Sequence, residues 1–130
     1  MKTTTEHCHL DEAIFIRQKD IRKKVLYAHI LWIGVDGSYC DFHLTNGETM
    51  IVVHSLSEIE KKLPPETFIR IHRSYIINID HVDGIIGNTV KIGKNVLPVS
   101  TPYYESLIPC FNLLEESSTL FKYKKRERKK

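Results

Sequence analysis

Short apolar runs separated by turn residues constrain this chain more than any other feature of its sequence. The segment YCDFHL at 39–44 alternates polar and apolar side chains, which is the period of a strand with one buried face. The pair Asn46-Gly47 that follows is a strong hairpin signal, and ETMIVV is the expected return strand. Residues 39–53 are therefore predicted to form a β-hairpin.

Runs of the same kind recur along the rest of the chain. They are AIFIRQ, KKVLYAHILWIGV, FIRIHRSYIINI and GIIGNTVKIGKNVLPVS, and turn residues follow or divide them at 36–38, 87–88 and 93–95. Long helical patterns do not alternate with these runs, so a parallel sheet with crossover helices is not expected. We expect a mainly β fold of about eight short strands in small antiparallel sheets.

Two short helices are predicted between the strands. Ser55 and Glu58 have the spacing of a capping box, and Pro64-Pro65 ends the helix after about two turns. Thr101-Pro102 is the expected N-cap and first residue of a second helix, which Pro109 interrupts.

Composition places the chain among ordinary single-domain globular proteins. It has 130 residues, 42% of them hydrophobic and 27% charged, and no apolar run approaches a membrane span of about 20 residues. The N-terminus lacks an apolar signal region, so a cytoplasmic location and no membrane partner are expected. Cys8, Cys40 and Cys110 form no paired motif and are expected to be reduced thiols.

Positive charge is concentrated in the last nine residues. KYKKRERKK at 122–130 holds seven basic residues and one acidic residue, whereas the other 121 residues hold 12 basic and 15 acidic residues. The tail either adds non-specific attraction to nucleic acid or is simply a solvated end.

The sequence offers only weak evidence for a catalytic site or a metal site. His72, Ser74 and Asp80 supply the residue types of a hydrolytic triad but lack a nucleophile elbow such as GxSxG. His7-Cys8-His9 has adjacent donors rather than the spaced pairs of a zinc site. Phosphate-binding and EF-hand motifs are missing. We therefore expect no enzyme, no metal, no cofactor and no small-molecule substrate.

The most informative segment is His72-Arg73-Ser74, which interrupts the strand-like run FIRIHRSYIINI. Burying an unpaired arginine would be very unfavourable, so the backbone must turn or bulge and expose Arg73. An exposed guanidinium can bind guanine O6 and N7 together, or grip a phosphate. A surface turn with a local salt bridge is the alternative that the residues alone leave open.

The run LPPETFIRIHRSYIIN at 63–78 closely resembles the central motif of the LytTR DNA-binding domain family. SLSEIEKKL at 55–63, ILWIGVDGSY at 30–39 and LPVS at 97–100 resemble flanking elements of that family, in the family's order. The resemblance runs from about Phe15 to Leu107. It implies a LytTR-like domain at 13–110 with stacked small sheets, followed by an extension at 111–130 that includes the basic tail. Residues 1–12 are polar and unpatterned, so a flexible segment is expected there.

The resemblance also implies a function. Family members regulate transcription by reading major-groove bases of double-stranded DNA through loops, commonly at paired repeats, so a homodimer on DNA is expected. The implied DNA-binding residues fall in three segments. They are Gly37, Ser38 and Tyr39; His72, Arg73 and Ser74; and Ser100 and Thr101.

Two departures from the family pattern qualify this expectation. Many relatives carry Arg or Lys where this chain has Thr101, which cannot make a bidentate guanine contact. The residues before the match leave no room for a receiver domain, so a stand-alone reader is expected. The alternative is a protein-interaction module that has lost DNA recognition. RNA binding is less favoured because the aromatic residues do not form the paired stacking platform of an RRM.

Overall fold

The computed structural model describes residues 12–115. The expectations for the N-terminal segment, for Cys8 and the His7-Cys8-His9 cluster, and for the basic tail lie outside these residues. Within 12–115 the chain forms ten strands, two α-helices and three 3-10 turns. In chain order these are β1 (Ala13–Gln18), β2 (Ile21–Leu26), η1 (Tyr27–His29), β3 (Ile30–Asp36), β4 (Tyr39–Leu44), β5 (Thr49–Val52), α2 (Leu56–Lys62), β6 (Phe68–His72), β7 (Tyr75–Asn78), η2 (Ile79–His81), β8 (Gly84–Ile86), β9 (Thr89–Ile92), β10 (Asn95–Pro98), α3 (Thr101–Leu107) and η3 (Ile108–Cys110).

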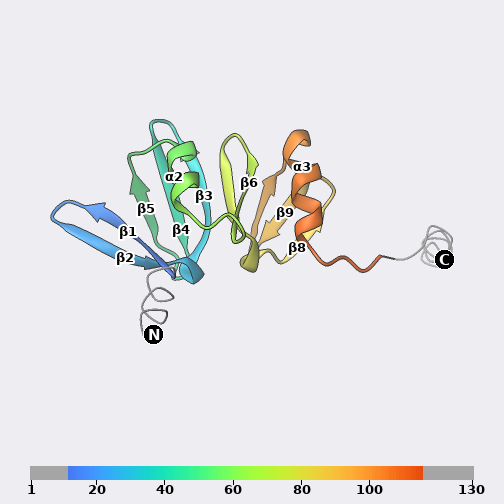
Figure 1. Cartoon of the computed structure of the whole chain (residues 1–130), viewed down its shortest axis with the longest axis horizontal. Helices are drawn as coiled ribbons and strands as arrows, with labels where there is room; N and C mark the ends of the chain where they lie inside the picture. The colour runs from blue at the N-terminus through green and yellow to red at the C-terminus, as the bar shows by residue number, and fades with distance from the viewer. Residues whose placement is uncertain (1–11, 116–130) are drawn as a thin grey trace, which may run out of the picture.

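The strands form three antiparallel sheets that follow one another along the long axis of the molecule (Figure 1). The β1–β2 hairpin lies at one end. A five-stranded sheet in the order β5-β4-β3-β7-β6 forms the centre, and β10-β9-β8 lies with α3 at the other end. The predicted fold class is confirmed. The ten strands exceed the eight or so that were expected, because three short strands lie within 84–100 and η1 divides the run at 23–35 between two strands.

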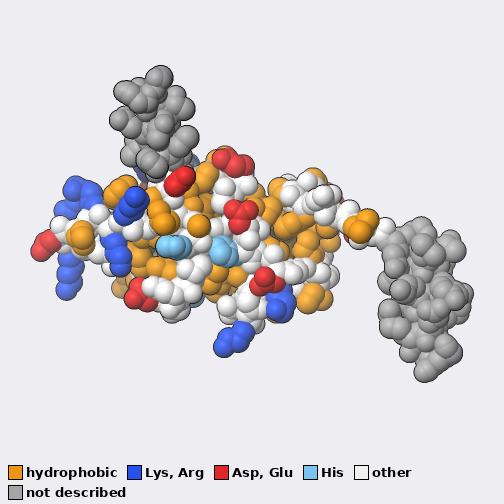
Figure 2. All heavy atoms as spheres, turned by 90° about the horizontal axis from the view of Figure 1, so that it is seen from below, with side chains coloured by type: hydrophobic (Ala, Val, Ile, Leu, Met, Phe, Trp, Pro, Cys, Tyr) orange, Lys and Arg blue, Asp and Glu red, His pale blue; other side chains and the backbone are white. Residues whose placement is uncertain are grey.

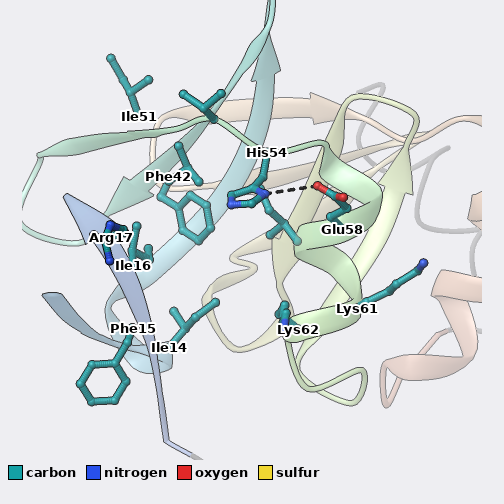
Figure 3. A pocket seen from close by; sticks show the side chains of 13 residues that line it. Ile14, Phe15, Ile16, Arg17, Phe42, Ile51, His54, Glu58, Lys61 and Lys62 are labelled. Atoms are coloured by element: carbon teal, nitrogen blue, oxygen red, sulfur yellow. Dashed lines mark hydrogen bonds and ion pairs between the residues drawn. The ribbon is translucent and has the colours of Figure 1, made fainter. Parts of the chain in front are cut away.

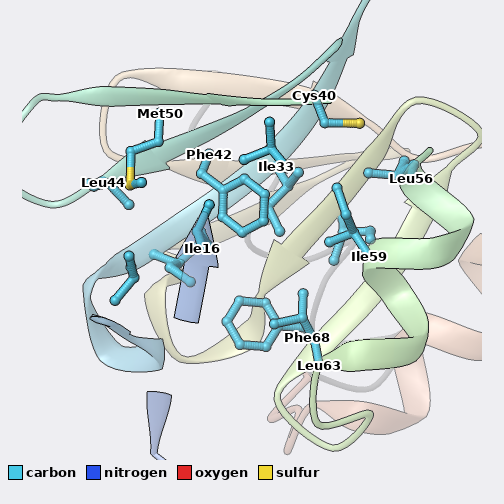
Figure 4. Packing of buried hydrophobic residues seen from close by; sticks show 14 residues of the cluster. Ile16, Ile33, Cys40, Phe42, Leu44, Met50, Leu56, Ile59, Leu63 and Phe68 are labelled. Carbon is cyan, nitrogen blue, oxygen red and sulfur yellow. The ribbon is translucent and has the colours of Figure 1, made fainter. Parts of the chain in front are cut away.

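One face of the central sheet packs against α2 and the β1–β2 hairpin (Figure 4). The predicted alternation in β4 is confirmed, since Cys40, Phe42 and Leu44 are buried and the residues between them are not. This face and its covering elements form the first core, whose members include Ile16, Ile33, Cys40, Phe42, Met50, Leu56, Ile59, Leu63 and Phe68. Removing this apolar surface from water is the main stabilisation of this half of the domain.

The opposite face of the sheet packs against the three-stranded sheet and α3. Ile71 and Ile77 contribute from the central sheet, and Leu107 contributes from α3; all three side chains are fully buried. The second core is completed by Val90, Ile92, Leu97 and Val99. Because Ile71 immediately precedes His72-Arg73-Ser74, this core fixes the strand from which the exposed segment projects.

Helix α2 begins as the capping box predicts. Ser55 Oγ accepts a hydrogen bond from the Glu58 backbone N at 3.1 Å, and the helix ends at Lys62, before Pro64. Glu58 Oε1 also lies 3.2 Å from His54 Nδ1, and this hydrogen bond, with a smaller contribution from the Ser55 backbone, lowers the pKa of Glu58. None of the helices within 12–115 combines the length and the apolar character that crossing a bilayer requires.

Asn78 is the one buried polar side chain among the described residues. Its Nδ2 donates hydrogen bonds to the carbonyl oxygens of Tyr27, at 3.0 Å, and Ile30, at 2.9 Å, while its Oδ1 accepts one from the Asp80 N at 2.9 Å. These bonds join the end of β7 to the η1 turn before β3. They explain how β3 is placed beside β7 despite the long chain between them.

A groove of about 720 Å³ separates β1 from α2 (Figure 3). Phe42 and Ile59 of the first core contribute to its lining, and Arg17 and Lys62 lie at its margins. The only hydrogen bond that the structure records between β1 and β5 is a long one, from Gln18 Nε2 to the Ile51 carbonyl oxygen at 3.5 Å. The β1–β2 hairpin is therefore attached to the sheet mainly through its buried apolar side chains.

Candidate nucleic-acid interface

The first predicted segment is a two-residue turn between β3 and β4. Asp36 and Tyr39 pair across the turn, which leaves Gly37 and Ser38 at its tip. Gly37 has φ of +65°, a conformation that residues with a Cβ rarely adopt. Gly37, Ser38 and Tyr39 are all exposed, with Tyr39 at 48%. The segment therefore presents backbone groups, a hydroxyl and an aromatic ring to solvent.

The second segment is the tight turn between β6 and β7. His72 pairs with Tyr75, so Arg73 and Ser74 occupy the tip, and the register shifts between Arg70 and His72. The Ser74 backbone N donates a hydrogen bond to His72 Nδ1 at 3.1 Å, which places the proton of a neutral His72 on Nε2. Arg73 is exposed and makes no ion pair with any residue in 12–115.

Arg70 fixes the shape of this turn. Its Nε donates to the His72 carbonyl oxygen at 2.8 Å, and its Nη2 donates to the Arg73 carbonyl oxygen at 2.8 Å. Its Nη1 forms an ion pair with Glu60 Oε1 of α2 at 2.9 Å. The side chain is only 13% exposed, so one nearly buried arginine holds the backbone from which the exposed Arg73 projects.

The third segment leads from β10 into α3. The Ser100 backbone N donates to the Ile71 carbonyl oxygen at 3.0 Å, which attaches this segment to the strand that carries Arg73. Thr101 was predicted as the N-cap, but Ser100 occupies that position. Ser100 has an extended backbone, and its carbonyl oxygen accepts from the amides of Tyr103 and Tyr104, so the helix begins at Thr101. Ser100 is partly buried and Thr101 is exposed.

Backbone hydrogen bonds bring the three segments to one edge of the molecule. The Val35 N donates to the Ser74 carbonyl oxygen at 3.0 Å, which joins the first turn to the second, as the Ser100–Ile71 bond joins the third. Figure 1 shows the two turns and the start of α3 in a row along the upper edge. Gly37, Ser38, Tyr39 and Arg73 also line one shallow depression of about 490 Å³, whose lining does not include Ser100 or Thr101.

Within 12–115 the structure does not bring together the residues of the possible hydrolytic triad or of a metal site. Asp80 lies in η2, beyond the opposite end of β7 from His72 and Ser74. No group of three metal-ligating side chains occurs within 12–115. Cys40 is buried and donates its thiol to the His54 carbonyl oxygen at 3.2 Å, and burial raises the pKa of this thiol, whereas Cys110 is exposed.

Sequence reasoning missed Arg70 and Glu60. Their pairing depends on the packing of β6 beside α2, which no local pattern reveals. The one available signal was Arg70 itself, a charged residue inside an apolar strand at a spacing of three residues from Arg73.

The proteins of known function that resemble this chain in sequence are named as transcriptional regulators or as a sensory transduction protein. The CO-responsive transcriptional regulator RcoM of Rhodospirillum rubrum is 36% identical over 55 residues, which are 42% of this chain and 23% of RcoM. The transcriptional regulatory protein LytR of Staphylococcus aureus is 34% identical over 74 residues, 57% of this chain and 30% of LytR. The sensory transduction protein LytT of Bacillus cereus is 36% identical over 85 residues, 60% of this chain and 34% of LytT. The match thus spans about a quarter to a third of these relatives.

A solved structure shares the fold. It is the LytTr DNA-binding domain of a Bacillus cereus protein named as a methyl-accepting/DNA response regulator. The TM-score is 0.65 at 22% sequence identity, and the match covers 78% of this chain and 98% of that domain. The family model described as the LytTr DNA-binding domain matches residues 21–110 of this chain. The chain therefore belongs to the LytTr DNA-binding domain family.

Proposed function

We propose that this chain is a sequence-specific transcription regulator that reads major-groove bases of double-stranded DNA through three loops. The observation that carries the proposal is the exposed guanidinium of Arg73 at the tip of a turn whose backbone is hydrogen-bonded to Arg70. The segments at 37–39 and 100–101 would contact the same duplex on either side of it.

The rigidity of the turn favours recognition over general attraction. A side chain that is ordered only on binding loses conformational freedom, and this loss weakens affinity. The Arg70 hydrogen bonds and the Val35–Ser74 bond hold the backbone of the tip before any DNA arrives. Only the Arg73 side chain then has to be ordered when it forms its bidentate contact with guanine.

The third segment is proposed to read DNA differently from the second. Thr101 is exposed and carries a hydroxyl and a methyl group, so it suits a phosphate oxygen or a thymine methyl rather than a guanine. His72 and Ser74 are partly buried and would orient Arg73 or contact phosphates. Paired repeats and two copies on one duplex remain part of the proposal.

Selection from random duplex DNA tests the proposal. The full chain is expected to enrich one motif, with the specific sequence preferred by about 10³-fold or more over unrelated duplex in a competition assay. If no motif is enriched, and size-exclusion chromatography instead identifies a tight protein partner, the chain is an interaction module and the proposal is wrong.

A further inference from the structure

The β1–β2 hairpin carries a disproportionate share of the positive charge. Residues 13–26 hold five of the eleven Lys and Arg residues within 12–115 but only one of the twelve Asp and Glu residues. The remaining described residues hold six basic and eleven acidic side chains. The hairpin therefore has a net charge of +4, and the remainder of the described domain has a net charge of −5. A polyanion would therefore be repelled by the remainder of the described domain and attracted by the hairpin.

The strand register places several of these cations on one face. Arg17 lies directly opposite Arg22, and Phe15 lies opposite Lys24. Successive side chains of a strand point to opposite faces, so these four residues share the face that is turned away from buried Ile16. Figure 2 shows Lys and Arg side chains gathered over this end of the molecule.

This arrangement is unfavourable in the isolated domain. Like charges directly opposite each other on paired strands repel, and Arg17 and Arg22 make no ion pair with any residue in 12–115. Phe15 lies beside them with 55% of its surface exposed. An external anion would relieve the repulsion, and the phosphates of a duplex supply a continuous row of negative charge.

The hairpin also occupies a suitable position. In Figure 1 it projects from the end of the molecule nearest the β3–β4 turn, which is the first of the three segments along the upper edge. A duplex that lies along these segments would pass the hairpin on one flank. The family match begins at residue 21 and does not include β1, so Arg17 and Lys19 are features of this chain that the match does not account for.

We propose that the outward face of the β1–β2 hairpin binds the phosphate backbone of the duplex on one flank of the sequence that the loops read. This inference rests on the proposed function. It adds a contact without sequence preference, which neutralises phosphates that the acidic remainder of the described domain cannot neutralise.

The test compares two variants of the full chain with equal net charge. The hairpin variant carries Arg17→Gln, Arg22→Gln and Lys24→Gln. Each Lys or Arg that leaves a phosphate contact lowers the slope of log K against log [salt] by about 0.9. The hairpin variant is therefore expected to lose about 2–3 units of slope, and about tenfold or more in affinity at low salt, equally for specific and unrelated duplexes.

The control variant carries Lys61→Gln, Lys62→Gln and Lys94→Gln, which removes three exposed cations from α2 and the β9–β10 turn. It should retain the slope of the unmodified chain. Thermal melting checks folding, and because Arg17 and Arg22 repel each other, the hairpin variant should melt no lower than the unmodified chain. Hydroxyl-radical footprinting should show protection shortened on one flank in the hairpin variant only.

Three results separate the possible failures. If the unmodified chain binds no duplex at all, the proposed function fails and the inference fails with it. If the unmodified chain binds but both variants have the same slope and footprint, only the hairpin inference is overturned. If the hairpin variant binds DNA normally but no longer sediments with phosphatidylglycerol–phosphatidylcholine vesicles that the unmodified chain binds, the hairpin contacts a lipid surface and the inference is again overturned.

Discussion

The guanidinium of Arg70 holds the backbone of Arg73, with its Nη2 donating to the Arg73 carbonyl oxygen at 2.8 Å. Two arginines three residues apart therefore have different environments. Arg70 is 13% exposed and uses its Nε, Nη1 and Nη2 atoms within the fold, whereas Arg73 is exposed and makes no ion pair within 12–115. Substitution of Arg73 should therefore affect recognition alone, whereas substitution of Arg70 should affect stability as well.

Replacing Arg73 by Ala should weaken binding to the selected sequence by about 1–3 kcal/mol, because one bidentate base contact is lost. The free energy of unfolding should change by less than about 0.5 kcal/mol, since the side chain is exposed. Gel-shift titration and urea denaturation measure the two quantities. A variant that binds the selected sequence as tightly as the unmodified chain would remove Arg73 from the interface.

Replacing Arg70 by Ala should destabilise the domain by about 1–3 kcal/mol, because the two carbonyl oxygens and Glu60 lose a charged donor. Specific DNA affinity should also fall, as the turn loses its preferred shape. Glu60→Gln is the matched control. It removes only the partly exposed ion pair, and it should change the unfolding free energy by at most about 1 kcal/mol. Equal losses in the two variants would show that the ion pair, rather than the backbone hydrogen bonds, matters.

Local sequence patterns predicted the elements that local chemistry controls. The alternation in 39–44, the Asn46-Gly47 turn and the capping box at Ser55 each depend on residues that are close in the chain, and the structure contains all three. The exposure of Arg73 followed from the high free energy of burying an unpaired charge. The β1–β2 turn was not predicted, because Lys19 adopts φ of +56° without a glycine to indicate it.

Features that depend on distant residues could not be predicted. The Arg70–Glu60 pair requires β6 to lie beside α2, and the hydrogen bond between Ser100 and Ile71 requires β10 to end beside β6. The hairpin pairing of Arg17 with Arg22 likewise follows only from the observed register. The charge count from the sequence treated all residues outside the basic tail together. Their net negative charge hid the concentration of Lys and Arg in the hairpin.

His43 should make stability depend on pH. It stacks on Trp32 with ring centroids 3.8 Å apart, and burial lowers its pKa below the usual 6.5, although Asp41 partly opposes the shift. The unfolded chain therefore binds a proton more readily than the folded chain does. The contribution of His43 is fully present above about pH 6.5 and is lost as the pH falls from there to its folded-state pKa.

The measurement is the urea midpoint of the unmodified chain and of His43→Phe at pH 7.5 and pH 5.0. Phe keeps an aromatic ring against Trp32 but cannot take up a proton. The difference in stability between the two proteins should therefore shift in favour of the variant at the lower pH, with the other histidines common to both. A difference that does not change with pH would show that His43 titrates alike in the folded and unfolded chains.

Replacing Asn78 by Ala should be among the most destabilising single changes outside the apolar cores. Asn78 is fully buried, and its loss leaves the carbonyl oxygen of Ile30 and the amide of Asp80 without the partner that this side chain provides. Leaving the buried Ile30 carbonyl and the partly buried Asp80 amide unsatisfied should lower the free energy of unfolding by about 2–4 kcal/mol. Asn95→Ala is the control, because Asn95 is exposed and makes no recorded side-chain hydrogen bond, so its effect should stay within about 0.5 kcal/mol. If urea denaturation gave similar midpoints for the two variants, Asn78 would not be what joins β7 to the turn before β3.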